Sequence, residues 1–79
     1  MRRRGQNEFT REELRRMAYL HMFVPDPVSM LLREFGTHTE ASWTMAWANL
    51  KGKMHPSALM EEVAAELDAD PAFAGWRDR

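Results

Sequence analysis

The chain has 79 residues and a net charge of −1, and 44% of its residues are hydrophobic, including three Trp, four Phe and seven Met. This composition suits one small folded domain and argues against both a wholly disordered chain and a strongly basic nucleic-acid binder. Because Cys is absent, disulfides, thiolate zinc sites and cysteine nucleophiles are excluded.

The first eight residues, MRRRGQNE, show no apolar periodicity. We expect residues 1–8 to form a flexible basic arm in front of a single helical domain that spans residues 9–79. No apolar run reaches the roughly 20 residues of a membrane span, and no apolar stretch follows the charged start as in a secretory signal. The expected localisation is therefore cytoplasmic, with no membrane contact.

A capping box marks the start of the first expected helix. Thr10 and Glu13 have the T-x-x-E spacing, in which each side chain bonds to a free amide, and Phe9 with Leu14 supplies a hydrophobic staple. The helical period gives this helix an inward stripe of Leu14, Met17, Ala18 and Val24.

Three further residues of this helix have distinct expected positions. His21 falls within the inward stripe, and we interpret it as a core histidine bonded to a carbonyl. Tyr19 and Phe23 point away from that stripe. They either pack under a later segment or form an exposed apolar patch.

The second helix is expected to begin at Asp26 and Pro27, because Asp is a favourable N-cap and Pro fits the first helical position. Its inward stripe follows the helical period and comprises Val28, Leu31, Leu32 and Phe35. Gly36 is expected to end the helix in a left-handed conformation.

The stretch from Thr37 to Leu50, THTEASWTMAWANL, predicts a helix that is apolar on two sides. Thr37 and Glu40 form a second capping box. The heavy stripe contains Trp43, Ala46, Trp47 and Leu50. The opposite stripe contains the smaller residues Ala41 and Ala48, with Met45 between them. Whether the first helix covers this small side is left open.

The fourth helix is expected to follow Pro56, with Met60, Val63, Ala64 and Leu67 directed inward. Glu66 and Asp68 near its end oppose the helix dipole, so we expect a basic neighbour from the first helix, namely Arg11, Arg15 or Arg16. Asp70-Pro71 then starts a last helical turn, in which Phe73 and Trp76 close the open end of the core.

These elements predict an all-α fold, a small bundle of four helices plus a short C-terminal helical turn. The predicted core consists of Leu14, Met17, Leu31, Leu32, Phe35, Trp43, Trp47, Leu50, Val63 and Leu67.

No catalytic or cofactor-binding motif occurs, so we expect a protein that is not an enzyme and binds no cofactor or small-molecule substrate. The even spacing of His21, His38 and His55 suggests the hypothesis of a metal site with three imidazole ligands, but the sequences that flank these residues share nothing. We therefore assign no metal ligands. His38 and His55 are expected to be solvated or to cap helices.

The surplus of large apolar residues favours a protein–protein interaction module of an accessory, inhibitor or assembly type. The partner is another protein, with a second copy of the chain as one option. The predicted partner-binding residues are Tyr19, Met22, Phe23 and Met45 on an apolar surface, and Glu61, Glu62 and Glu66 on an acidic one.

The alternative hypothesis is a helix-turn-helix DNA-binding regulator built from residues 27–50. Arg2, Arg3 and Arg4 would form a minor-groove arm, and Thr44 and Asn49 would contact the DNA. The expected recognition helix contains no Arg, so phosphate contacts would be weak.

Overall fold

The computed structural model describes residues 8–79. These residues contain four α-helices and two short 3-10 helices, joined by loops. Their bounds are α1 Arg11–Phe23, α2 Pro27–Glu34, α3 Glu40–Leu50, α4 Ala58–Asp68, η1 Pro71–Phe73 and η2 Trp76–Asp78. The predicted all-α class is confirmed, and the two 3-10 helices form the predicted C-terminal turn.

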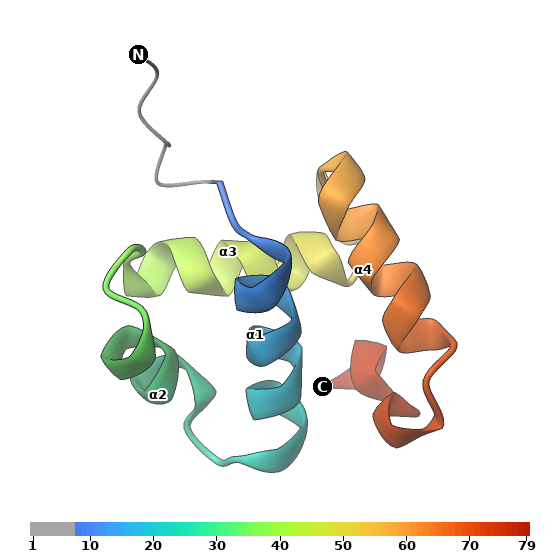
Figure 1. Cartoon of the computed structure of the whole chain (residues 1–79), viewed down its shortest axis with the longest axis horizontal. Helices are drawn as coiled ribbons and strands as arrows, with labels where there is room; N and C mark the ends of the chain where they lie inside the picture. Colours follow the sequence, from blue (N-terminus) through green and yellow to red (C-terminus); the bar gives the residue numbers. More distant parts are fainter. Residues whose placement is uncertain (1–7) are drawn as a thin grey trace.

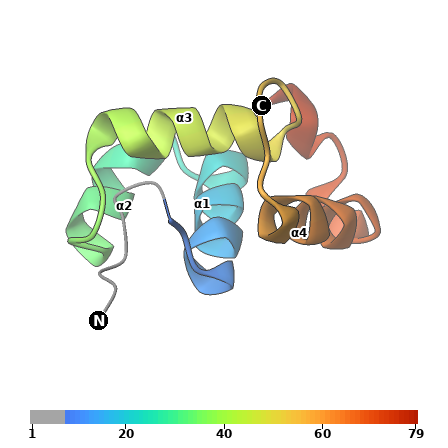
Figure 2. The ribbon, with the colours of Figure 1, turned by 90° about the horizontal axis from the view of Figure 1, so that it is seen from above.

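Helix α1 lies at the centre of the fold and contacts α2, α3 and α4 (Figure 1). Helix α3 crosses α1, while α2 and α4 lie on opposite sides of it, as the view from above also shows (Figure 2). In the last turn, η1 packs on α4, and its Phe73 ring also contacts Phe23 of α1. The η2 turn packs on α1, and its Trp76 ring also contacts Trp47 of α3. Each of α2, α3 and α4 therefore packs against the central helix α1.

Side-chain caps fix where the helices begin. The Thr10–Glu13 capping box is present as predicted, with the Thr10 amide donating to the Glu13 carboxylate at 2.9 Å. Asp26 caps α2 as predicted, and Pro27 is its first residue. The predicted cap of α3 is wrong. Thr39, not Thr37, is the N-cap, because its hydroxyl accepts the amide of Ser42 at 3.1 Å.

Two other predicted boundaries differ from the structure. Helix α4 begins at Ala58, after Ser57 as the N-cap, and not directly after Pro56. Gly36 does not adopt a left-handed conformation, because α2 ends at Phe35 with extended backbone. The glycines with positive φ in residues 8–79 are Gly52 and Gly75.

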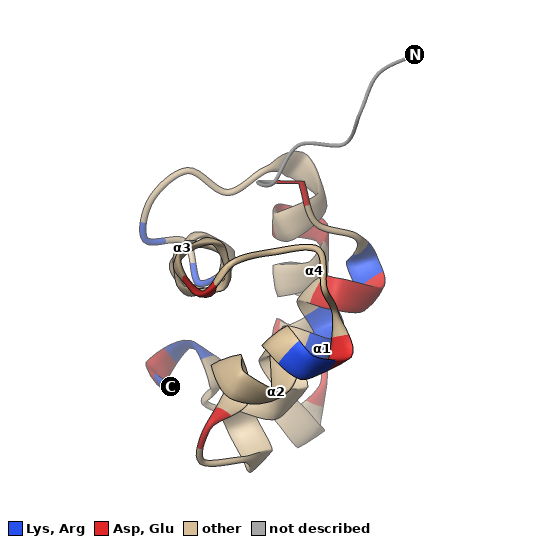
Figure 3. Ribbon diagram, turned by 90° about the vertical axis from the view of Figure 1, so that its left-hand side faces the viewer, with Lys and Arg blue, Asp and Glu red and all other residues tan. Residues whose placement is uncertain are grey.

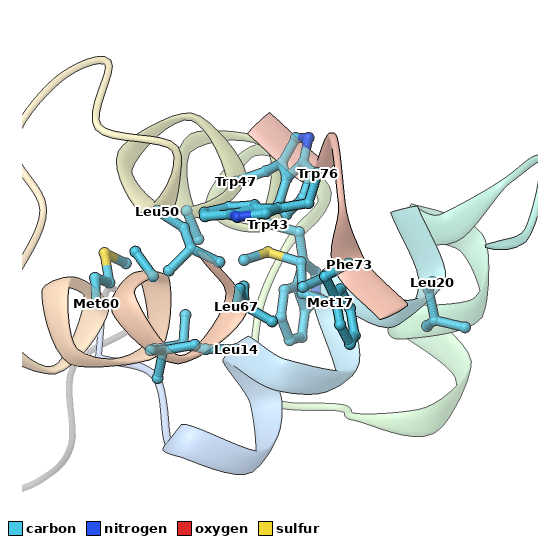
Figure 4. Packing of buried hydrophobic residues seen from close by; sticks show 14 of the residues in the cluster. Leu14, Met17, Leu20, Trp43, Trp47, Leu50, Met60, Leu67, Phe73 and Trp76 are labelled. Carbon is cyan, nitrogen blue, oxygen red and sulfur yellow. The ribbon is translucent and has the colours of Figure 1, made fainter. Parts of the chain in front are cut away.

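The core lies between the helices and is closed by the C-terminal turn (Figure 4). It contains Leu14, Met17, Ala18, Leu20, Leu31, Trp43, Ala46, Trp47, Leu50, Met60, Val63, Ala64, Leu67, Phe73 and Trp76. The prediction that Phe73 and Trp76 close the core is confirmed, since both side chains are buried.

Leu32 was predicted to be a core residue, and this is wrong because its side chain is 40% exposed. It is separated from Leu31 by one helical step of about 100°, so an eight-residue helix packed on α1 and α3 buries Leu31 alone. Phe35, also predicted in the core, is only half-buried at its edge.

Candidate interaction surfaces

Tyr19 and Phe23 form an exposed aromatic surface on α1. Their side chains are 45% and 54% exposed, and their ring centroids lie 5.0 Å apart. The Phe23 ring also packs on the buried Phe73 ring in a T-shaped arrangement, with ring centroids 6.2 Å apart. We call Tyr19, Phe23 and Phe73 the aromatic ridge. Of the two outcomes left open by the sequence, the exposed patch is the one that the structure shows.

Charged residues border the aromatic ridge. The Arg16 guanidinium lies 5.3 Å from the centre of the Tyr19 ring, within cation–π range. It also donates two hydrogen bonds to the Glu34 carboxylate of α2, at 2.8 and 2.9 Å, and these bonds fix its position. Glu12 and Arg15 complete a shallow hollow of about 420 Å³ beside Tyr19 and Phe73.

A second hollow lies between α3 and the start of α4. Met45 is 50% exposed there, and Ala41 is exposed, so α1 does not cover the small side of α3. The hollow has a volume of about 490 Å³, and we call it the α3–α4 groove. Its lining comprises Phe9, Ala41, Ser42, Met45, Ala46, Asn49, His55, Ser57 and Met60.

The apolar residues that were predicted to form one partner-binding surface lie on separate parts of the molecule. Tyr19 lines the hollow beside the aromatic ridge, Met45 lines the α3–α4 groove, and no lining residue is common to both. Met22 is half-buried and packs against the core instead of standing on the surface.

The acidic face of α4 is ion-paired with α1. Figure 3 marks the Asp and Glu positions of the ribbon in red and the Lys and Arg positions in blue. Arg11 bonds to Glu62 at 2.7 Å and also to Glu66, and Arg15 bonds to Glu66 at 3.0 Å. The predicted basic neighbour of Glu66 is thus present. Glu61 is exposed and borders a separate hollow near Arg77. A basic partner at this face would have to compete with two arginines of the same chain.

A polar junction that no sequence pattern indicated joins α1 to the α2–α3 loop around the buried side chains of Glu13 and His38. The Glu13 carboxylate accepts the Thr10 amide, the Thr37 hydroxyl at 2.7 Å, and a contact at 3.2 Å from Nε2 of His38. His38 is buried, so its predicted solvated or capping position is wrong. We call these four residues the Glu13 junction. Only its Thr10 bond belongs to a pattern that is readable in sequence.

Opposing effects set the pKa of Glu13. Burial alone would raise it, but the hydrogen bonds from Thr10, Thr37 and His38, together with the charge interaction with His38, outweigh burial. The pKa of Glu13 is therefore below its ordinary value. The carboxylate is the form that the folded state favours.

His21 was predicted to be a core histidine bonded to a carbonyl. Its Nδ1 lies 2.9 Å from the carbonyl oxygen of Met17, as predicted, but its side chain is only half-buried. Its ring stacks on Trp47 with centroids 4.1 Å apart. Burial lowers its pKa, the Met17 bond partly offsets this, and Lys51 lowers it further. Across residues 8–79, no group of three His, Asp or Glu side chains could hold a metal ion.

The residues of the DNA-binding hypothesis are only partly placed. Arg2, Arg3 and Arg4 lie outside the described residues. The Thr44 hydroxyl donates to the Glu40 carbonyl, and the Asn49 side chain accepts the amide of His55. Both polar groups are thus engaged within the chain, and DNA binding stays a prediction.

No protein-family model matches the chain, and neither the curated proteins nor the solved structures contain a significantly similar one. Among the helices of residues 8–79, none is long and apolar enough to cross a membrane.

Proposed function

We propose that the chain is a non-enzymatic protein-interaction module that binds a short amphipathic helical segment of another protein on the aromatic ridge. The supporting observation is the exposure of Tyr19 and Phe23, two adjacent aromatic side chains above the buried ring of Phe73. Aromatic side chains with a fixed position are the usual anchors of protein interfaces.

The shape of the surface supports a helical segment as the ligand. Glu12 and Phe23 are separated by eleven positions of α1, which corresponds to roughly 16 Å along the helix axis. A partner helix of about three turns could lie along this length with its apolar side on the rings. Arg16 is already fixed by Glu34, so it needs little ordering when a partner binds.

The size of the surface favours a segment of another protein over a second copy of this chain. A fully buried aromatic side chain removes roughly 150–250 Å² from water, so two half-exposed rings offer roughly 200 Å². A standard stable interface needs about 800 Å² from each partner. The aromatic ridge would therefore supply the centre of a small interface, not a whole dimer contact.

Photocrosslinking tests the proposal in the native cell. Phe23→benzoylphenylalanine and Leu32→benzoylphenylalanine place the same probe on the aromatic ridge and on exposed α2. We expect one protein to be crosslinked at position 23 and not at position 32. After purification, it should bind the Phe23→Asp variant at least tenfold more weakly than wild type and the Leu32→Asp variant unchanged.

Three results would contradict the proposal. They are crosslinking of the chain only to itself, equal loss of binding in the Phe23→Asp and Leu32→Asp variants, and binding that is insensitive to both. Light scattering of the wild type detects the self-association that the first result implies.

A further inference from the structure

Phe9 occupies an unusual position between the core and the α3–α4 groove. It precedes α1 and belongs to no helix. Its ring stacks on His38 with a centroid separation of 3.8 Å and an interplanar angle of 19°, and it lies 5.1 Å from the Trp43 ring. The same side chain also lines the α3–α4 groove. Phe9 therefore separates the groove from Trp43.

The Glu13 junction fixes the chain on either side of this contact. Thr10, the next residue after Phe9, donates its amide to Glu13. His38, on which Phe9 stacks, contacts the same carboxylate, and Thr37 beside it donates its hydroxyl. One buried side chain thus orients both surfaces of the Phe9–His38 stack.

Trp43 beneath Phe9 has an unsatisfied polar atom. Its side chain is 0% exposed, and its Nε1 has no hydrogen-bond partner among residues 8–79. By contrast, the indole of Trp47 donates to the carbonyl of Arg79, and that of Trp76 donates to Asp68. A buried donor without a partner destabilises the closed arrangement, so access of water to Trp43 would offset part of the loss of packing.

We infer that Phe9 is a lid over Trp43, fixed by the Glu13 junction, which opens while α1 to α4 remain folded. Opening moves the Phe9 ring out of the wall of the α3–α4 groove, so that the groove extends to the Trp43 ring and its indole N–H. The lid contains no residue of the aromatic ridge, so the proposed function and the lid can fail independently.

Hydrogen exchange of the three indole N–H groups, measured by NMR on the whole chain, tests the lid. In the wild type, the protection factor of the Trp43 indole should be at least tenfold smaller than that of the amide of Leu67, whose side chain is fully buried in the core. In the Glu13→Gln variant, Trp43 exchange should rise at least a further tenfold, while Trp47 and Trp76 change less than twofold. Glu12→Gln is the matched control on an exposed position and should change none of them.

The opposite outcomes are equally clear. A parallel rise of all three indoles in Glu13→Gln would mean general destabilisation, and an unchanged Trp43 would mean that Glu13 fixes no lid. Either result overturns the inference. If Glu13→Gln does not fold, Thr37→Val removes only the hydroxyl bond to the same carboxylate and is judged by the same criteria.

Discussion

The carboxylate of Glu13 and the imidazole of His38 meet inside the protein at 3.2 Å, although 25 positions separate the two residues in sequence. This contact joins the first turn of α1 to the loop before α3. Glu13 therefore has two tasks: it caps α1 by accepting a local amide, and it also contacts a residue from a distant segment.

Acid should destabilise the fold through Glu13. Because the pKa of Glu13 is lower in the folded state, its contribution is present above the ordinary pKa of about 4.3 and is lost as the pH falls through the folded value. Urea unfolding from pH 6 to pH 2.5 measures this. We expect Glu13→Gln to flatten the fall below about pH 4.5. An equal effect of Glu12→Gln would contradict the assignment.

His21 should affect the stability of the fold in a higher pH range than Glu13. Burial lowers its pKa, so the unfolded chain binds the proton first, and stability falls as the pH drops below about 6.5. His21→Gln should reduce the change in unfolding free energy between pH 7 and pH 5. A change between pH 7 and pH 5 in His21→Gln as large as in the wild type would contradict this assignment.

The fold should require a large aromatic ring at position 43 but not the indole N–H of Trp43. Trp43→Ala removes a fully buried aromatic and should cost roughly 3–5 kcal/mol, enough to unfold a domain of this size. Trp43→Phe retains a ring and removes an N–H group that has no hydrogen-bond partner among residues 8–79, so it should lose clearly less stability. Met45→Ala, exposed on the same helix, is the reference. A cooperative melt of Trp43→Ala near the wild-type temperature would disprove the central position of this residue.

The ion pairs between α1 and α4 should stabilise the fold, and this stabilisation should depend on the salt concentration. Arg11→Gln removes the bonds to Glu62 and Glu66, which lie at the surface, so its melting temperature should be lower than that of the wild type at low salt. The difference should shrink at 1 M salt because the charges are screened. Arg33→Gln on α2 supplies the control, and a salt-independent loss in Arg11→Gln would point to packing instead.

Local signals predicted the helices well because they act over a few residues. The capping box at Thr10, the Asp26-Pro27 start and the Trp43–Trp47 stripe all follow from contacts within one or two turns. The cap of α3 was assigned to Thr37 from its spacing to Glu40, although Thr39 can cap a helix equally well. The structure resolves this through a distant residue, because the Thr37 hydroxyl bonds to Glu13 and Thr39 remains to cap α3.

The candidate surfaces were predicted less completely. Tyr19 and Phe23 were predicted to point away from the inward stripe, but whether they are exposed was left open. Their exposure and the contact of Phe23 with Phe73 depend on how the last turn packs. The separation of Met45 from Tyr19 depends on how α1 and α3 cross. The spacing of apolar residues within one helix gives no information about that crossing. Burial of His38 likewise depends on contacts between distant segments.

The late position of Trp76 in the chain has a consequence for biosynthesis. Its ring packs on Trp47 at 5.8 Å, on the same indole that His21 covers by stacking. As the polypeptide leaves the ribosome from its N-terminus, α1, α2 and α3 emerge first and can associate. One side of Trp47 then stays open to chaperones or to neighbouring nascent chains until residue 76 has emerged.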